Sequence, residues 1–162
     1  MFPKRLLAVP AVRRTGLKAL RGWFLLSRGL TLGVRAAAID AENRVCLVRH
    51  TYAPGWQLPG GGVEIGEDAL EALDRELREE AAIALRGTPY LHGVFFNGRA
   101  SRRDHVLIFV VREFDILAPK RADREIAECR FFPVDALPTE TTRGTRDRLV
   151  EIAGGRVPTA QW

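Results

Sequence analysis

The sequence predicts an α+β fold in which helices pack on both faces of a β-sheet, an α/β/α sandwich. Short β-rich runs and two amphipathic helical segments follow one another along the chain. Hydrophobic residues make up 46% of the sequence, as in an ordinary globular protein. The length of 162 residues suits one domain. Strands, a helix, strands and a closing helix favour layered packing of this kind.

The first predicted strands are residues 34–39 and 45–48, two short β-rich runs. The intervening residues 40–43, Asp-Ala-Glu-Asn, are typical of a turn, so we expect a β-hairpin here. A passage rich in Pro and Gly follows at 53–67, which predicts irregular backbone.

A helix is predicted over residues 67–82. Its apolar stripe consists of Leu70, Leu73, Leu77 and Ala81, which recur at helical spacing.

The second half of the chain predicts three further strands and a closing helix. Residues 90–96 and 105–114 are β-rich, and the polar loop 97–104 between them carries three arginines. Another strand is expected at 130–134 and a helix at 141–152.

Basic residues are concentrated near the start of the chain. The net charge is +5, yet no acidic residue precedes Asp40. The remainder therefore carries a net charge of −3, which argues against nucleic acid as a partner of the domain. The early basic residues are Lys4, Arg5, Arg13, Arg14, Lys18, Arg21, Arg28 and Arg35.

We expect three regions: a basic helical arm at 1–30, a domain at 31–155 and a tail at 156–162. Three roles stay open for the arm, namely packing on the domain, binding to an anionic membrane surface or partner, and a disordered or targeting segment. Apolar runs fall short of the roughly 18 residues of a membrane span, and none matches a signal peptide. A cytoplasmic protein is expected, peripheral at a membrane if the arm binds lipid. The oligomeric state stays open, with a homodimer as one alternative.

The two cysteines, Cys46 and Cys129, lie in strand-like runs. Buried thiols in a reducing compartment are favoured over a disulfide or a metal pair. The sequence has no CxxC motif and no Cys/His cluster, which argues against zinc.

Three carboxylates share one face of the helix predicted at 67–82. Glu76 precedes Glu79 and Glu80 by three and four residues, the spacing of neighbours on a helix surface. Like charges at this spacing destabilise a bare helix, so a compensating cation is expected, and hard oxygen ligands suit Mg²⁺. Taken alone, the helix also fits a solvated acidic face.

A glycine-rich loop precedes these carboxylates. Gly60, Gly61 and Gly62 allow the backbone to approach a ligand closely. The loop and the helix together offer metal ligands of two kinds, backbone carbonyls and side chains.

The pattern Gly61-x5-Glu67-x7-Arg75-Glu76-Leu77-x-Glu79-Glu80 resembles the Nudix box. The sequences around residues 56–61 and 131–138 are also similar to Nudix domains, so the resemblance covers about 31–152. One position departs from the box, because Ala82 stands where the family has a glycine at the end of the helix. Alanine there is expected to shift or strain the helix terminus.

This resemblance implies a Nudix-type sandwich with a mixed sheet that hydrolyses a nucleoside diphosphate linked to another group X. The implied cofactor is Mg²⁺, with Mn²⁺ as a substitute. The implied metal ligands are Gly61, through its backbone oxygen, and Glu67, Glu76, Glu79 and Glu80, with Glu67 acting through a metal-bound water. Arg75 is implied to hold the first glutamate that follows it, Glu76, in orientation by a charge-assisted hydrogen bond. Because the carboxylates are close together, at least one is expected to have a raised pKa before metal binds.

The general base is a box glutamate in many relatives and a loop glutamate in others. Here the loop candidate is Glu125, with Glu128 second, and a surface salt bridge is the alternative role for Glu125. Substrate contacts are expected from arginines that clamp phosphate and aromatic rings that stack on a base. The main candidates are Arg49, Tyr52, Trp56, Arg102 and Arg103, and further candidates are His50, Arg99 and His105. A structural role is the alternative for His105, and a solvated loop tip for the arginines.

The sequence is consistent with three functions. The first is hydrolysis of a nucleoside diphosphate sugar or similar compound, although the proline typical of ADP-ribose-specific members is absent from 97–99. The second is hydrolysis of nucleoside triphosphates, including oxidised ones. The third, a non-catalytic Nudix-fold binding or regulatory protein, is disfavoured because all box glutamates are present.

Overall fold

The structure, a computed structural model, describes residues 29–162. The helical arm expected at 1–30 therefore lies outside the described residues, except for its last two positions. The described elements are β1 (Thr31–Ala38), β2 (Arg44–His50), β3 (Trp56–Gln57), α2 (Ala69–Ala81), β4 (Ile83–Leu85), β5 (Tyr90–Phe96), β6 (Asp104–Val111), β7 (Phe114–Ile116), β8 (Ile126–Pro133) and α3 (Arg143–Ala153).

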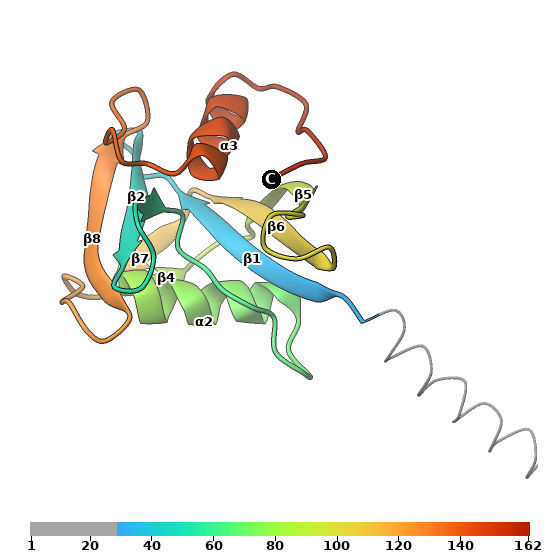
Figure 1. The fold of residues 1–162 in the computed structure, drawn as a ribbon. Coiled ribbons are helices and arrows are strands. Elements are labelled where there is room, and N and C mark those ends of the chain that lie inside the picture. The colour runs from blue at the N-terminus through green and yellow to red at the C-terminus, as the bar shows by residue number, and fades with distance from the viewer. Residues whose placement is uncertain (1–28) are drawn as a thin grey trace, which may run out of the picture. The chain divides into compact units, whose positions relative to one another are not determined.

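The strands form a mixed β-structure in three hydrogen-bonded groups. In the first, β1 pairs with β6 in parallel and β5 pairs with β6 in antiparallel orientation. In the second, β2 lies between β3 and β8, and in the third β4 pairs with β7, all antiparallel. Figure 1 shows the strands between α2 on one side and α3 on the other, which confirms the predicted fold class.

Strand β1 separates two hydrophobic cores because its side chains alternate between its faces. Val34, Ala36 and Ala38 pack with the buried residues of α2. Ala37 and Ile39 pack in the second core, which includes Leu149 of α3. Both faces of the strand are therefore covered, as expected for a strand inside a sandwich.

The predicted hairpin at 34–48 is wrong, although the turn at 40–43 is present. Only one bridge, Ile39 with Val45, joins the two strands. Beyond it, β1 follows β6 and β2 follows β8. Apart from Arg35, the strand run 34–39 is apolar on both faces. This pattern suits parallel pairing in a covered sheet better than a hairpin with one solvated face.

Helix α2 is shorter than predicted and buries a different set of residues. It begins after Asp68, whose carboxylate accepts hydrogen bonds from the backbone N–H groups of Leu70 and Glu71. Leu70 was expected in the apolar stripe but is 41% exposed, because it lies in the first turn, before the helix makes its buried contacts. The buried apolar residues are Ala72, Leu73, Leu77 and Ala81.

The helix ends at Ala82 in the left-handed conformation, with φ of 53° and ψ of 40°. The helix therefore keeps the terminus that glycine favours, and alanine takes a strained backbone conformation.

Other boundaries differ by a few residues. The strand predicted at 105–114 is divided into β6 and β7, and β8 extends four residues further toward the N-terminus than predicted.

Cys46 and Cys129, on the adjacent strands β2 and β8, are free thiols with their Sγ atoms 3.5 Å apart.

The last residues contact the domain. The Phe96 N–H donates to the carbonyl of Ala160, and the Trp162 N–H donates to the carbonyl of Phe96. The Trp162 side chain packs against the second core. Within residues 29–162, no helix is long and apolar enough to cross a bilayer.

Candidate functional site

Arg75 connects the acidic side chains around the start of α2. Its Nε and one terminal nitrogen donate to the two carboxylate oxygens of Glu67, at 2.9 and 3.1 Å. The other terminal nitrogen donates to Glu76 at 2.8 Å and to Glu79 at 3.4 Å. The Arg75 hydrogen bonds lower the pKa of Glu67. One guanidinium thus joins three of the glutamates singled out in the sequence.

Glu76 is half-buried and lies close to other negative charges. Burial raises the pKa of Glu76, Arg75 opposes this effect, and the negative charges of Glu80 and Glu79 add to it. The raised pKa agrees with the expectation for a crowded cluster of carboxylates.

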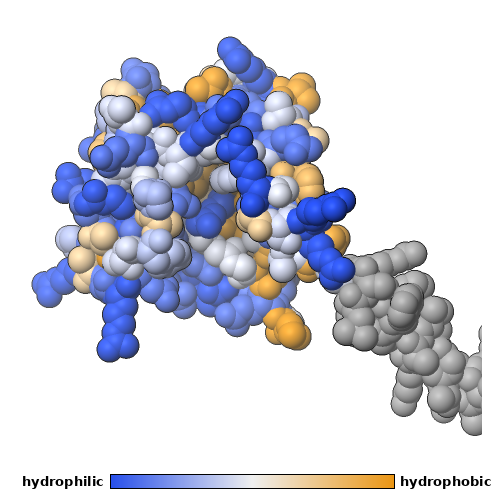
Figure 2. Space-filling view, in the orientation of Figure 1, coloured by the Kyte–Doolittle hydropathy of each residue, from blue (hydrophilic) through white to orange (hydrophobic). Residues whose placement is uncertain are grey.

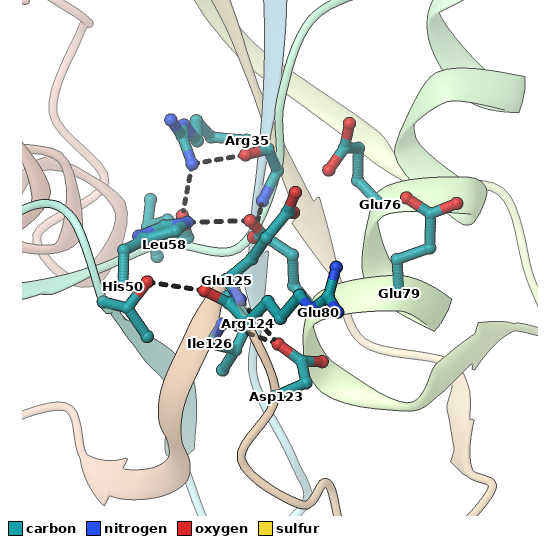
Figure 3. Close-up of polar contacts among 12 residues, drawn as sticks. Arg35, His50, Leu58, Glu76, Glu79, Glu80, Asp123, Arg124, Glu125 and Ile126 are labelled. Atoms are coloured by element: carbon teal, nitrogen blue, oxygen red, sulfur yellow. Dashed lines mark hydrogen bonds and ion pairs between the residues drawn. The ribbon is translucent and has the colours of Figure 1, made fainter.

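Glu80 differs from its neighbours because it is buried. Its Oε1 atom lies 2.8 Å from Nε2 of His50, and its Oε2 atom accepts from the backbone N–H of Gly60 at 2.8 Å. Only 6% of Glu80 is exposed, whereas the Glu79 side chain is 62% exposed. Glu80 is therefore held between β2 and the glycine loop, and His50 contacts this carboxylate (Figure 3).

The glycine loop is fixed to β1 by its backbone. The Val34 N–H donates to the carbonyl of Gly61, and the Ala36 N–H donates to that of Pro59. Gly60 has a φ of 140°, and a Cβ atom there would overlap the backbone of Val34. Arg35, on the same strand, donates to the carbonyls of Leu58 and Gly60 (Figure 3). The loop needs its glycines to pass this close to the strand.

The donor set fits Mg²⁺ in kind. Glu76, Glu79 and Glu80 supply hard carboxylate oxygens, and a Cβ on Gly61 would overlap the carboxylate of Glu76, so loop backbone and side chain meet directly. The Gly61 carbonyl, which accepts from β1, has a second lone pair. In the described part of the chain, no three Asp, Glu, His or Cys side chains are arranged to hold an ion.

The loop before β8 brings Glu125 to the same region. Asp123 accepts from the backbone N–H groups of Glu125 and Ile126, at 2.9 and 2.8 Å, and pairs with Lys120. The Lys120 ammonium also donates to the carbonyl of Glu79 at 2.6 Å, which ties the loop to α2. Figure 3 shows Glu125 among these groups, between Arg35 and the pair Glu76 and Glu79.

A cavity of about 790 Å³ lies at the end of β2, and its lining includes Arg49, His50 and Tyr52. Tyr52 is 74% exposed, and the centre of its ring lies 5.0 Å from that of His50. Arg49 is paired with Glu128 and its guanidinium lies 5.7 Å from the centre of the Trp56 ring. Tyr52 is therefore open to a ligand, and Arg49 already has partners.

The remaining substrate candidates are placed differently. Trp56 is 6% exposed and packs edge-on against Phe132, so its ring is committed to the core. Arg102 and Arg103 are exposed in the β5–β6 loop and line none of the described cavities. His105 packs against Phe96 at 5.5 Å, in line with its structural alternative.

Two polar contributors to this region, Arg35 and Lys120, are not predicted from the sequence as site residues. Arg35 interrupts an apolar strand, and that interruption is a signal that could have identified it. Lys120 contacts α2 only through the fold, and no local signal marks it.

Residues 29–151 match the family model described as NUDIX domain. An ADP-ribose pyrophosphatase from Methanocaldococcus jannaschii is 32% identical over 104 residues, which cover 62% of this chain and 60% of that protein. An 8-oxo-dGDP phosphatase from Homo sapiens is 29% identical over 133 residues, which cover 79% of this chain and 40% of that protein. The matches thus span less than two thirds of these curated relatives.

Among solved structures, a MutT Nudix hydrolase from Burkholderia pseudomallei aligns with a TM-score of 0.62 and 27% identity. The alignment covers 75% of this chain and 97% of that one. Since the family model spans most of the sequence, and the box lies on the loop and helix just described, the chain belongs to the Nudix family.

Proposed function

We propose that this protein is a Mg²⁺-dependent hydrolase that cleaves the pyrophosphate bond of a nucleoside diphosphate linked to a group X. The observation that carries the proposal is the cluster of Glu67, Glu76 and Glu79 around Arg75, beside the buried Glu80 and the glycine loop. Such a cluster offers oxygen ligands to a divalent cation in the register of the Nudix box.

Different residues bind the metal and position its ligands. Gly61, Glu67, Glu76, Glu79 and Glu80 would hold Mg²⁺, which neutralises phosphate charge and makes a water more acidic when bound. Arg75 keeps Glu67 and Glu76 in orientation through charge-assisted hydrogen bonds.

The general base is assigned to Glu125, with a box glutamate as the alternative. Glu125 is exposed and its loop is anchored on both sides, by Asp123 and by Thr51, whose N–H donates to the carbonyl of Glu125. An anchored loop places a carboxylate reproducibly, which general base catalysis requires.

Nucleoside diphosphate sugars are the leading substrate class. The relative from Methanocaldococcus jannaschii is an ADP-ribose pyrophosphatase, and ADP-ribose is a nucleoside diphosphate linked to a sugar. The second candidate is a nucleoside triphosphate, oxidised ones included. The human 8-oxo-dGDP phosphatase supports an oxidised base, although its named substrate is a diphosphate. Tyr52, exposed beside the cavity at the end of β2, is the aromatic side chain best placed to stack on a base.

The test is phosphate or nucleotide release from a panel of nucleoside diphosphate sugars, nucleoside triphosphates and oxidised nucleotides, with and without Mg²⁺. Glu79→Gln and Glu80→Gln are each expected to lower kcat by about a hundredfold, because each change removes one carboxylate charge from the cluster. Chelation of the metal with EDTA is expected to abolish turnover.

Glu113→Gln serves as the matched control. Glu113 is an exposed glutamate between β6 and β7, outside the Arg75 cluster, so its variant is expected to keep wild-type activity. Metal-dependent turnover that persists in the Glu79 and Glu80 variants would refute the site. If no compound of the panel is hydrolysed but nucleotides still bind, the non-catalytic binding protein replaces the proposal.

A further inference from the structure

A second cavity, of about 1100 Å³, lies between the β5–β6 loop, α3 and the C-terminal residues. This volume is sufficient for a nucleotide-sized ligand. Its lining holds two acidic residues, Asp147 and Glu151, and a larger set of arginines that gives it a net charge of +3. The arginines are Arg99, Arg143, Arg146, Arg148 and Arg156.

One arginine of the lining, Arg148, is buried, and its charge is neutralised by Glu151. Arg148 is 3% exposed, donates to Glu151 at 2.7 Å and to Thr159 at 3.0 Å, and its guanidinium lies 4.3 Å from the centre of the Phe95 ring. The buried Arg148–Glu151 pair therefore serves the fold, and its charges cancel.

The other four arginines of the lining, Arg99, Arg143, Arg146 and Arg156, form what we call the arginine rim, and they have few protein partners for their charge. Within residues 29–162, the side chains of Arg99 and Arg156 have no hydrogen bond or ion pair to a protein group. Among the residues that the structure describes, Arg143 has one exposed ion pair at 3.5 Å, and Arg146 donates only to the carbonyl of Pro138. Arginines that project from three different segments into one cavity suit a phosphate, which accepts several such hydrogen bonds. Figure 2 shows hydrophilic side chains around a hollow in the visible face.

The chain that leads into the glycine loop also borders this cavity. Gln57 lines the cavity and lies three residues before Gly60, so their Cα atoms are at most about 11 Å apart. The Thr142 N–H, at the start of α3, donates to the carbonyl of Trp56 at 3.0 Å. The segment 56–60 thus borders the cavity at Gln57 and contacts the buried Glu80 at Gly60, and we expect one extended ligand to reach both ends of this segment.

We infer that the arginine rim binds a further phosphate of the substrate, one outside the pyrophosphate that is cleaved. The inference rests on the proposed function, and it narrows the substrate class to nucleotides that carry an additional phosphomonoester or phosphodiester. Phe96 and Trp162, which also line the cavity, offer apolar surface to the sugar or base that carries this phosphate.

The binding test uses isothermal titration with two probes, AMP and adenosine 2′,5′-bisphosphate. The bisphosphate is expected to bind about tenfold more tightly, since a hydrogen bond to a charged group contributes at least that factor. Arg99→Gln and Arg156→Gln should each reduce this preference, and the double variant should abolish it. Arg86→Gln, an exposed arginine that lines neither this cavity nor the glutamate site, should retain it.

The activity test compares kcat/KM within two matched pairs, and its arms distinguish the source of the phosphate. ADP-ribose against its 2′-phosphate tests a monoester, and a nucleoside 5′-triphosphate against a 5′-triphosphorylated dinucleotide tests a diester. A preference for the extra phosphate in either pair, lost in the double variant, supports the inference. Equal binding of both probes together with equal kcat/KM in both pairs overturns it. If no pair is turned over, the proposed function fails, and the titration alone decides the inference.

Discussion

At the scale of single residues, Ala82 has the backbone geometry that an alanine least favours. Its φ of 53° belongs to the left-handed region, which costs an L-residue about 1–2 kcal/mol relative to glycine. Ala82→Gly is therefore expected to raise the free energy of unfolding by about 1 kcal/mol, as measured by urea denaturation. Ala69→Gly, at the other end of α2, is the control and should not stabilise the protein. An unchanged or lower midpoint for Ala82→Gly contradicts this account.

Some residues of the site can be predicted from the sequence, and others cannot. The spacing of Arg75, Glu76 and Glu79 within one helix is local, so their shared surface follows from helix geometry. The burial of Glu80 against His50 depends on where β2 lies relative to α2, which no local pattern encodes. For the same reason Trp56, taken from the sequence as a substrate contact, is in fact a core residue.

At the scale of elements, the Asp123 carboxylate is a central anchor of the loop between β7 and β8. The backbone N–H of Ile126, the Lys120 ammonium and the N–H of Glu125 lower the pKa of Asp123 to about 2, from an ordinary value of 3.8. A carboxyl whose pKa is lower in the folded state stabilises the fold above pH 4 and loses that contribution as the pH falls toward 2.

Asp123→Asn is therefore expected to be less stable than the wild type at neutral pH, and the difference should shrink between about pH 4 and pH 2. Urea midpoints across this pH range measure it. Asp135→Asn, at an exposed aspartate of another loop, provides the comparison and should track the wild type throughout. A difference that does not depend on pH would mean that the charge of Asp123 does not anchor the loop.

The elements themselves were predictable to different degrees. Strand β5 and both described helices follow from periodicity within a few residues. The short strands β3, β4 and β7 have two or three residues each and carry no periodic signal. The pairing of β1 with β6 joins segments about 70 residues apart. The turn at 40–43 instead favours pairing of β1 with β2, so the sequence predicts the wrong partner.

At the scale of the whole molecule, Trp162 joins the end of the chain to the centre of the domain. Its indole meets Phe95 at 6.3 Å, and it lies so close to Gly144 that a Cβ there would be 2.7 Å from Nε1. Trp162→Ala is expected to lower the free energy of unfolding by about 3 kcal/mol through lost burial. Trp162→Phe should retain most of the stability. Thermal unfolding of the three proteins is the measurement, and equal melting temperatures would show that the contact contributes nothing.

The arginine cavity is assembled from β3, the β5–β6 loop, α3 and the C-terminal residues, which lie far apart along the chain. An unfolded chain cannot reproduce such a surface, so its ligand binds only the native state. By mass action, that ligand raises the free energy of unfolding by RT ln(1 + [L]/Kd), about 2.7 kcal/mol at a hundredfold excess over Kd. The melting temperature therefore reports whether the cavity holds a ligand. A collection of phosphorylated compounds can be ranked by melting temperature alone, in wild-type protein or in a variant that no longer turns them over.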